Sequence, residues 1–158
     1  MNRGDLDMTF GGSCLCGGVR FEVTGPVQTF EYCHCRRCRK VTGAAGLPAL
    51  AVPRDGFRLL EGGELIATYE APLLHGPPAY TSSFCRRCGS TVPLPRNDFE
   101  VVEVPAGLLD DEPPVGIDKH IFVEFAPAWD PSQDALPRYT REELRALRRR
   151  VGQATVLD

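Results

Sequence analysis

The chain has 158 residues, of which 42% are hydrophobic and 25% are charged, and its formal net charge is −3. This length and composition predict one globular domain with a substantial core and exclude a disordered chain. The negative charge argues against a protein built mainly to coat nucleic acid or an acidic membrane. No apolar run reaches the roughly 20 residues of a membrane span, and no signal-peptide pattern opens the chain, so we expect a cytoplasmic protein.

Short β-strands, separated by glycine and proline, are the main predicted elements. Residues 19–23 (VRFEV) alternate apolar and charged side chains, which is typical of a half-buried strand. Residues 57–70 (FRLLEGGELIATYE) hold two strand-like runs around a Gly-Gly pair, which predicts a hairpin. Residues 99–104 and 120–125 are rich in β-branched and aromatic side chains, so both are predicted strands.

One segment, residues 140–151 (TREELRALRRRV), clearly predicts a helix. Thr140 as N-cap and Glu143 three residues later form a capping-box pattern, and apolar residues then recur at helical spacing. We interpret the arginines of this segment as a solvated face rather than a nucleic-acid patch. The expected fold is mostly β, with an N-terminal extension (1–11), a zinc-binding domain (12–140) and a C-terminal helix with a tail (141–158).

The cysteines carry the strongest functional pattern. All seven fall into three groups, a C-x-C, a C-x-C-x-x-C and a C-x-x-C, which are Cys14 and Cys16; Cys33, Cys35 and Cys38; Cys85 and Cys88. In a reducing compartment an odd number of cysteines fits metal binding better than disulfides. On an extended segment the sulfurs of C-x-C point to one face, and C-x-x-C-G forms a knuckle whose glycine permits the tight bend.

Spacing alone allows two ways to build a four-cysteine zinc site. The favoured way joins Cys14 and Cys16 to Cys85 and Cys88 and leaves the middle triad for a second zinc. The other way joins part of the triad to the knuckle and leaves Cys14 and Cys16 spare. A third interpretation has a single zinc, with the remaining cysteines buried or incidental.

A zinc ion on the middle triad would have three thiolate ligands and an open fourth position, which is typical of a catalytic site. Three thiolates donate much more charge than three imidazoles, so such an ion is poorly suited to generating hydroxide. It is suited to a soft fourth ligand such as a substrate thiolate. The triad therefore favours thiol chemistry over hydrolysis.

Positive side chains flank the triad and the knuckle. Arg36, Arg37, Arg39 and Lys40 surround the triad, and Arg86 and Arg87 lie inside the knuckle. They are candidates for attracting the carboxylates of a peptide-like thiol, with Arg36, Arg37 and Arg39 expected to bind substrate. The alternative is that individual members simply solvate the loops.

Other candidate residues have structural interpretations. His34 lies between two proposed ligands and on a strand would face away from them, so it is not expected to bind the metal. His120 is expected to be a hydrogen-bonded structural residue rather than a catalytic base. His75 is expected in a surface loop, and Trp129 in the core or a pocket wall.

The chain resembles the glutathione-dependent formaldehyde-activating enzyme family in six motifs, which are, in chain order, GSCLCGGVRFEV, CHCRRCRKVTGA, FCRRCGS, AGLLDD, HIFV and LPRYT. The resemblance runs from about Gly12 to Thr140 and implies an antiparallel β-tent fold with two zinc ions per chain. It implies a structural zinc on Cys14, Cys16, Cys85 and Cys88 and a catalytic zinc on Cys33, Cys35 and Cys38. The activity that it implies is formation of S-(hydroxymethyl)glutathione from formaldehyde and glutathione, a carbon–sulfur lyase reaction.

Two functions follow as hypotheses. The first is a zinc-dependent carbon–sulfur lyase that acts on a small thiol/carbonyl adduct, with glutathione as the partner. The second is a zinc-stabilised binding module that holds an anionic ligand or nucleic acid on its basic loops. A membrane partner is not expected, nucleic acid is disfavoured by the net charge, and a homodimer is compatible with the sequence.

Overall fold

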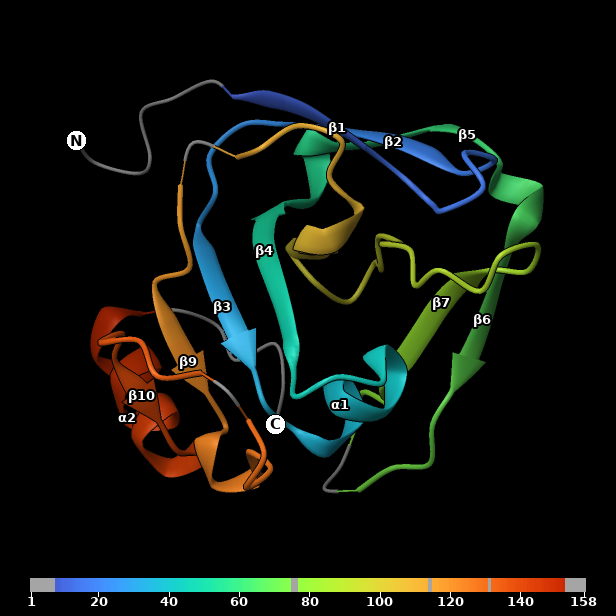
Figure 1. Cartoon of the computed structure of the whole chain (residues 1–158). Coiled ribbons are helices and arrows are strands. Elements are labelled where there is room, and N and C mark those ends of the chain that lie inside the picture. Colours follow the sequence, from blue (N-terminus) through green and yellow to red (C-terminus); the bar gives the residue numbers. More distant parts are fainter. Residues whose placement is uncertain (1–7, 75–76, 114, 131, 153–158) are drawn as a thin grey trace. The chain divides into compact units, whose positions relative to one another are not determined.

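A computed structural model of the chain describes residues 8–74, 77–113, 115–130 and 132–152. The chain forms two compact units, each made of two stretches of sequence (Figure 1). The first unit contains Met1–Thr29 and Leu50–Gly116, and the second contains Phe30–Ala49 and Ile117–Asp158. No helix among the described residues is long and apolar enough to cross a membrane.

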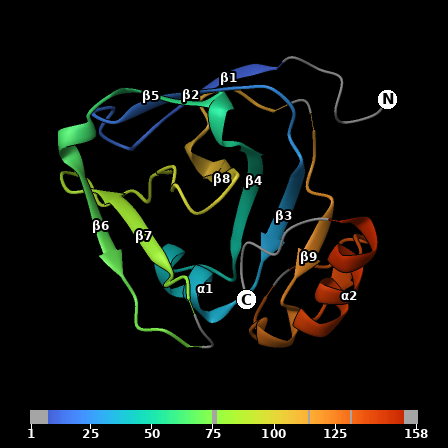
Figure 2. The same cartoon turned by 180° about the vertical axis from the view of Figure 1, so that it is seen from behind.

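The first unit is built from antiparallel strands. One sheet has the order β1 (Thr9–Ser13), β2 (Arg20–Thr24), β5 (Phe57–Glu61), and β2 pairs antiparallel with both neighbours. A second antiparallel pair joins β6 (Ile66–Glu70) to β7 (Thr81–Cys85). Figure 2 shows both sets of strands from behind.

The predicted alternation of residues 19–23 is confirmed. Phe21 and Val23 are buried on β2, and the Phe21 ring stacks on Phe57 of β5 with the ring centroids 5.5 Å apart. The predicted strand at 99–104 is also confirmed as β8 (Val101–Pro105), with Val102 and Val104 buried. Every second side chain of these strands therefore points into the core.

The predicted hairpin at residues 57–70 is wrong. β5 pairs with β2 and β6 pairs with β7, and a short 3₁₀ helix, Gly63–Leu65, separates them. Gly62 has a φ of 81°, and a Cβ at this position would lie 2.0 Å from the carbonyl oxygen of Gly18. The chain therefore turns at Gly62 and Gly63 from one sheet into another, and the backbone of Gly18 packs against Gly62.

The second unit contains parallel pairs. β9 (Lys119–Ile121) pairs parallel with β3 (Thr29–Cys33) on one side and with β10 (Arg138–Tyr139) on the other. A short helix, α1 (Arg36–Thr42), follows β3, and β4 (Leu47–Pro53) then leads into the first unit. The sequence did not indicate α1, because seven residues rich in arginine show no helical periodicity.

The predicted C-terminal helix is confirmed as α2 (Arg141–Val151), with Thr140 and Glu143 forming the capping box. It lies beside β9 in both views (Figures 1 and 2). Leu144 of α2 joins a buried cluster in this unit whose other members are Cys33, Cys38, Ile121 and Phe122. The Arg148 guanidinium of α2 donates a buried hydrogen bond to Glu31 at 3.0 Å.

The strand predicted at residues 120–125 is only partly correct. β9 ends at Ile121, Phe122 has a φ of 57°, and a 3₁₀ helix covers Val123–Phe125. Phe122 is buried, and the guanidinium of Arg141 lies 5.7 Å from the ring centroids of both Phe122 and Phe125. The predicted fold class is confirmed: the chain is mostly β, with antiparallel sheets and a short C-terminal helix.

Candidate metal centres

The first unit brings together four cysteines. The Sγ atoms of Cys14, Cys16, Cys85 and Cys88 all lie within 4.8 Å of one another. Cys14 and Cys16 follow β1, Cys85 ends β7, and Cys88 lies in the turn after it. This grouping is the one that the cysteine spacing favours.

Tight turns aim these sulfurs at one another. The Gly17 N–H donates to the Cys14 carbonyl at 2.8 Å, and the Gly89 N–H donates to the Cys85 carbonyl at 2.7 Å. Both glycines have a positive φ, 72° and 79°, which a glycine adopts without strain. The knuckle is therefore as predicted, but Cys14 and Cys16 converge through a turn and not through the extended segment that we expected.

The four-sulfur arrangement fits a tetrahedral zinc ion. Zn–S bonds near 2.3 Å place tetrahedral sulfurs about 3.8 Å apart. The Cys14–Cys16 and Cys16–Cys85 sulfur distances are 3.5 and 3.9 Å. The hydroxyl of Ser90 also holds the pKa of Cys88 at about 5, which favours a thiolate.

The second unit brings together three cysteines. The Sγ atoms of Cys33, Cys35 and Cys38 lie within 4.8 Å of one another, and Cys33 and Cys38 are buried whereas Cys35 is half-buried. Cys33 ends β3, Cys35 is the N-cap of α1, and Cys38 lies in the helix. The Cys38 N–H points to the Cys35 sulfur at 3.4 Å. The change from strand to helix within five residues turns all three sulfurs toward one point.

The three thiols strongly change one another's pKa values. Hydrogen bonds from Cys33 and Cys38 lower the pKa of Cys35 to about 3. The hydrogen bond with Cys35 raises the pKa of Cys33 well above its ordinary value, and hydrogen bonds with Cys33 and Cys35 do the same for the pKa of Cys38. One negative charge is therefore stable among the three sulfurs, whereas three thiolates this close require a cation. The donor set fits a thiophilic metal ion such as zinc.

The arginines predicted to bind substrate have different surroundings. Arg36 and Lys40 are exposed on α1, whereas Arg37 and Arg39 are half-buried. The Arg39 guanidinium donates to the Phe125 carbonyl at 2.9 Å and lies 6.0 Å from the centre of the Trp129 ring. Arg39 therefore holds the Val123–Phe125 segment, and Arg36 is the better candidate for an incoming anion.

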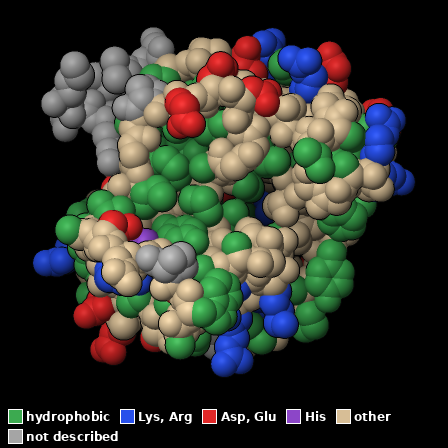
Figure 3. Space-filling view, viewed as in Figure 1, with side chains coloured by type: hydrophobic (Ala, Val, Ile, Leu, Met, Phe, Trp, Pro, Cys, Tyr) green, Lys and Arg blue, Asp and Glu red, His purple; other side chains and the backbone are tan. Residues whose placement is uncertain are grey.

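Some predicted residues lie elsewhere. Trp129, which was expected in the core or a pocket wall, is 64% exposed, so the core alternative is wrong. Arg86 and Arg87 are exposed in the first unit, beside the four-cysteine group. His75 lies outside the described residues. The face in Figure 3 carries both basic and acidic side chains, so it is not a surface of one charge.

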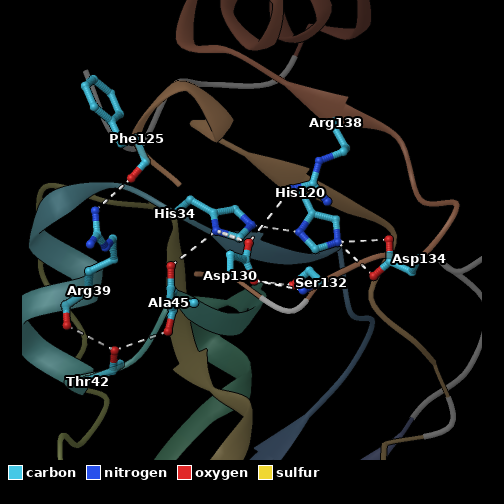
Figure 4. A network of polar contacts seen from close by, with 11 residues as sticks. His34, Arg39, Thr42, Ala45, His120, Phe125, Asp130, Ser132, Asp134 and Arg138 are labelled. Carbon is cyan, nitrogen blue, oxygen red and sulfur yellow. Dashed lines mark hydrogen bonds and ion pairs between the residues drawn. The ribbon is translucent and has the colours of Figure 1, made fainter. Parts of the chain in front are cut away.

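A buried histidine pair, which the sequence did not indicate, lies in the second unit, where His34 directly follows Cys33 in the chain (Figure 4). His34 Nε2 and His120 Nδ1 are 2.8 Å apart, and the two rings stack with centroids 5.1 Å apart. His34 Nδ1 lies 3.2 Å from the Ala45 carbonyl, and His120 Nε2 lies 2.9 Å from the Asp134 carboxylate. The expectation that His120 is a hydrogen-bonded residue agrees with these contacts.

The acceptors fix the tautomer of His34. The Ala45 carbonyl can only accept, so His34 carries its hydrogen on Nδ1. Burial lowers the pKa of His34, and its Nε2 shares a 2.8 Å hydrogen bond with His120 Nδ1. Asp130, whose Oδ2 lies 3.4 Å from His34 Nδ1, is itself held by Ser132 at 2.7 Å.

The fold and these two cysteine groups define a β-rich protein with two sites that could hold metal ions. A family model described as glutathione-dependent formaldehyde-activating enzyme matches residues 9–125. This match covers most of the chain, and the chain therefore belongs to that family. The resemblance stated from the sequence motifs is confirmed.

One curated relative and one solved structure illustrate the similarity. A Halomonas elongata protein named "Putative glutathione-dependent formaldehyde-activating enzyme" is 33% identical over 127 residues, which are 77% of this chain and 80% of that protein. The crystal structure of a Rhodobacter sphaeroides protein has 23% identity and a TM-score of 0.49, covering 66% of this chain and 91% of that one.

Proposed function

We propose that this protein is a zinc-dependent carbon–sulfur lyase that joins formaldehyde to glutathione, or releases it from the adduct, at Cys33, Cys35 and Cys38. The observation that carries this proposal is the convergence of these three sulfurs, two of them buried, in one unit. Three protein ligands are typical of a catalytic zinc, because they leave a position for substrate. The family and the name of the Halomonas elongata relative support glutathione and formaldehyde as the substrates.

Addition of glutathione to formaldehyde needs neither an oxidant nor a reductant. The glutathione sulfur forms a bond to the formaldehyde carbon, the carbonyl oxygen takes up the thiol proton, and the product is S-(hydroxymethyl)glutathione. A bound zinc ion would supply Lewis acidity that stabilises the substrate thiol as a thiolate. The reverse reaction breaks the same carbon–sulfur bond.

The residues of the chain would hold the metal and orient the thiol. Cys33 and Cys38 are buried, so they would anchor the ion away from water, and the half-buried Cys35 marks the accessible side. Exposed Arg36 and Lys40 on α1 are placed to attract the carboxylates of glutathione. In this proposal Arg37 assists them, and Arg39 acts through the segment that it holds.

We propose a second, structural zinc on Cys14, Cys16, Cys85 and Cys88. A closed set of four thiolates leaves no position for substrate, so this ion would stabilise the first unit only. The cofactor content is then two zinc ions per chain. The domain boundaries at residues 11/12 and 140/141, the cytoplasmic location and the homodimer stay predictions.

The alternative, a non-catalytic module for an anionic ligand or nucleic acid, has weaker support. The net charge is −3, and the face in Figure 3 carries charges of both signs. An anionic ligand would therefore have to bind at the arginine-rich helices α1 and α2 alone. Binding of an oligonucleotide that falls steeply with salt and survives the loss of the zinc at Cys33, Cys35 and Cys38 would favour this alternative.

The test is the zinc content of purified protein, together with turnover. We expect two zinc ions in the wild type and one in Cys35→Ser, and we expect the variant to lose acceleration of glutathione–formaldehyde exchange over the spontaneous rate. Exchange measured by NMR gives the rate in both directions. Cys88→Ser is the matched control, because it should lose the other zinc and stability. A Cys35→Ser protein with two zinc ions and full activity refutes the assignment.

A further inference from the structure

The side chain of His34 is the most completely enclosed group beside the three-cysteine group. It is 0% exposed, and it lies in the sequence between Cys33 and Cys35. Its backbone N–H donates to the Ile121 carbonyl at 3.0 Å. The edge of the Tyr32 ring packs against the imidazole with centroids 4.6 Å apart. Each polar atom of the residue that can donate therefore has an acceptor, and the ring is confined (Figure 4).

The contacts of His34 bridge two parts of the second unit. Through Nε2 the ring bonds His120 on β9, and through Nδ1 it bonds the Ala45 carbonyl in the loop after α1. The bridge from His34 to Ala45 encloses α1, and with it Cys35 and Cys38. Closing the segment at both ends restricts the backbone from which these two sulfurs project.

A second set of bonds tightens the same segment. The Thr42 hydroxyl lies 2.8 Å from the Cys38 carbonyl and 3.2 Å from the Gly46 carbonyl. At Gly46 a Cβ would lie 2.5 Å from the Cys33 carbonyl oxygen, so the end of the loop packs directly on the end of β3. The loop that accepts the His34 hydrogen bond is therefore itself held against the first cysteine of the group.

We propose that His34 is a positioning residue for the three-cysteine centre: clamped between His120 and Ala45, it fixes the backbone that carries Cys33, Cys35 and Cys38. The residue acts on the metal ligands through the chain and is not a ligand itself, since the three-sulfur group does not include its nitrogens. This inference rests on the proposed function only in that the three sulfurs hold a metal ion. It assigns a role to the histidine that lies between two ligands.

The test compares two side chains of nearly the same size. His34→Asn keeps an amide N–H near the position of Nδ1 and can donate to the Ala45 carbonyl, whereas His34→Leu cannot donate at all. Loss of groups that orient metal ligands weakens metal binding by roughly 10- to 100-fold. We therefore expect His34→Leu to bind metal at the three-cysteine site at least about tenfold more weakly, and His34→Asn to recover a large part of this loss.

The readout is cobalt(II) binding to the metal-free protein, in competition with a chromophoric chelator. Thiolate-to-cobalt absorption of the three-cysteine site is isolated by subtracting the spectrum of Cys35→Ser. Thr140→Ala is the control, because it destabilises the same unit through α2 and should leave both cobalt sites intact. Should both His34 variants fail to fold, the pair His120→Leu and His120→Asn tests the other contact that holds His34, the 2.8 Å hydrogen bond between His34 Nε2 and His120 Nδ1.

The outcomes separate this inference from the proposed function. Wild-type cobalt affinity and spectrum in a folded His34→Leu protein overturn the positioning role. Equal losses in His34→Leu and His34→Asn overturn it too, because the hydrogen bond would not matter. A wild type that binds two ions without any turnover overturns only the proposed function. A wild type that binds no ion at the three-cysteine site overturns both.

Discussion

Replacing Gly62 by alanine tests whether the corner after β5 is held by a close backbone contact. Gly62 has a φ of 81°, and a Cβ there would meet the Gly18 carbonyl oxygen at 2.0 Å and the Val19 Cα at 2.9 Å. Gly89 has nearly the same φ, 79°, but nothing among the described residues lies within 4 Å of a Cβ there. The two glycines therefore differ in crowding and hardly in backbone conformation.

The expected magnitudes follow from this difference. An alanine in the left-handed region costs roughly 1–2 kcal/mol, which is the loss expected for Gly89→Ala. Even close carbon–oxygen contacts in proteins are about 3.3 Å or longer, so Gly62→Ala must displace the Gly18 carbonyl by more than about 1 Å. We expect Gly62→Ala to lower the free energy of unfolding by about 3 kcal/mol or more.

The assay is urea unfolding of both variants and the wild type in saturating zinc, which keeps metal loading constant. Gly18 lies between Cys16 and Val19, and the Val19 N–H donates to the Cys14 sulfur at 3.2 Å. Displacement of Gly18 should therefore also weaken metal binding at the four-cysteine site. Equal free energies of unfolding for Gly62→Ala and Gly89→Ala would show that the contact does not constrain this corner.

Four further predictions concern the second unit and the metal ions. Thr140→Ala removes the α2 cap and should lower the free energy of unfolding by about 1 kcal/mol in urea titrations; an unchanged value contradicts a stabilising cap. The N–H of Thr140 and its hydroxyl lower the pKa of Glu143 below 4.5, so this stabilisation is full above that pH and is lost as the pH falls through the folded-state pKa. Glu143→Gln should flatten this acid limb of a stability–pH curve, and an unaltered limb argues against the assignment. Arg148→Ala breaks the buried ion pair with Glu31 and should lower the free energy of unfolding by roughly 3 kcal/mol. This is at the low end for a buried pair, because Lys119 still lies 3.2 Å from Glu31. A decrease of less than about 1 kcal/mol would contradict this prediction. Chelation of zinc should lower the melting temperature and added zinc should restore it, whereas an unchanged melting curve would contradict metal-dependent stability.

The grouping of the cysteines could be predicted from the sequence because ligand spacing is local chemistry. C-x-x-C-G at Cys85 and Cys88 needs only a turn with a glycine, and the structure places that turn where expected. Which groups meet in space is not local, yet the favoured pairing with Cys14 and Cys16 is the one found. The turn at Gly17 was missed, because a C-x-C pattern suits an extended segment equally well.

The elements that the sequence did not predict depend on contacts between distant residues. α1 has no apolar stripe of its own, and it is held by Cys35 as N-cap and by the bonds of Thr42. β9 ends at Ile121, although apolar residues continue beyond it, because Phe122 turns into the buried cluster. His34 and His120 are 86 residues apart in the chain, so only the parallel pairing of β3 and β9 reveals their contact.

Each cysteine group lies wholly inside one compact unit, although the chain passes from one unit to the other after residues 29, 49 and 116. The two metal ions would then bind and dissociate separately, and loss of either ion would destabilise only the unit that holds it. Oxidation of the three-cysteine group would remove its capacity to hold a metal ion and leave the four-cysteine group intact. Selection could likewise alter one centre in a related protein without remaking the other.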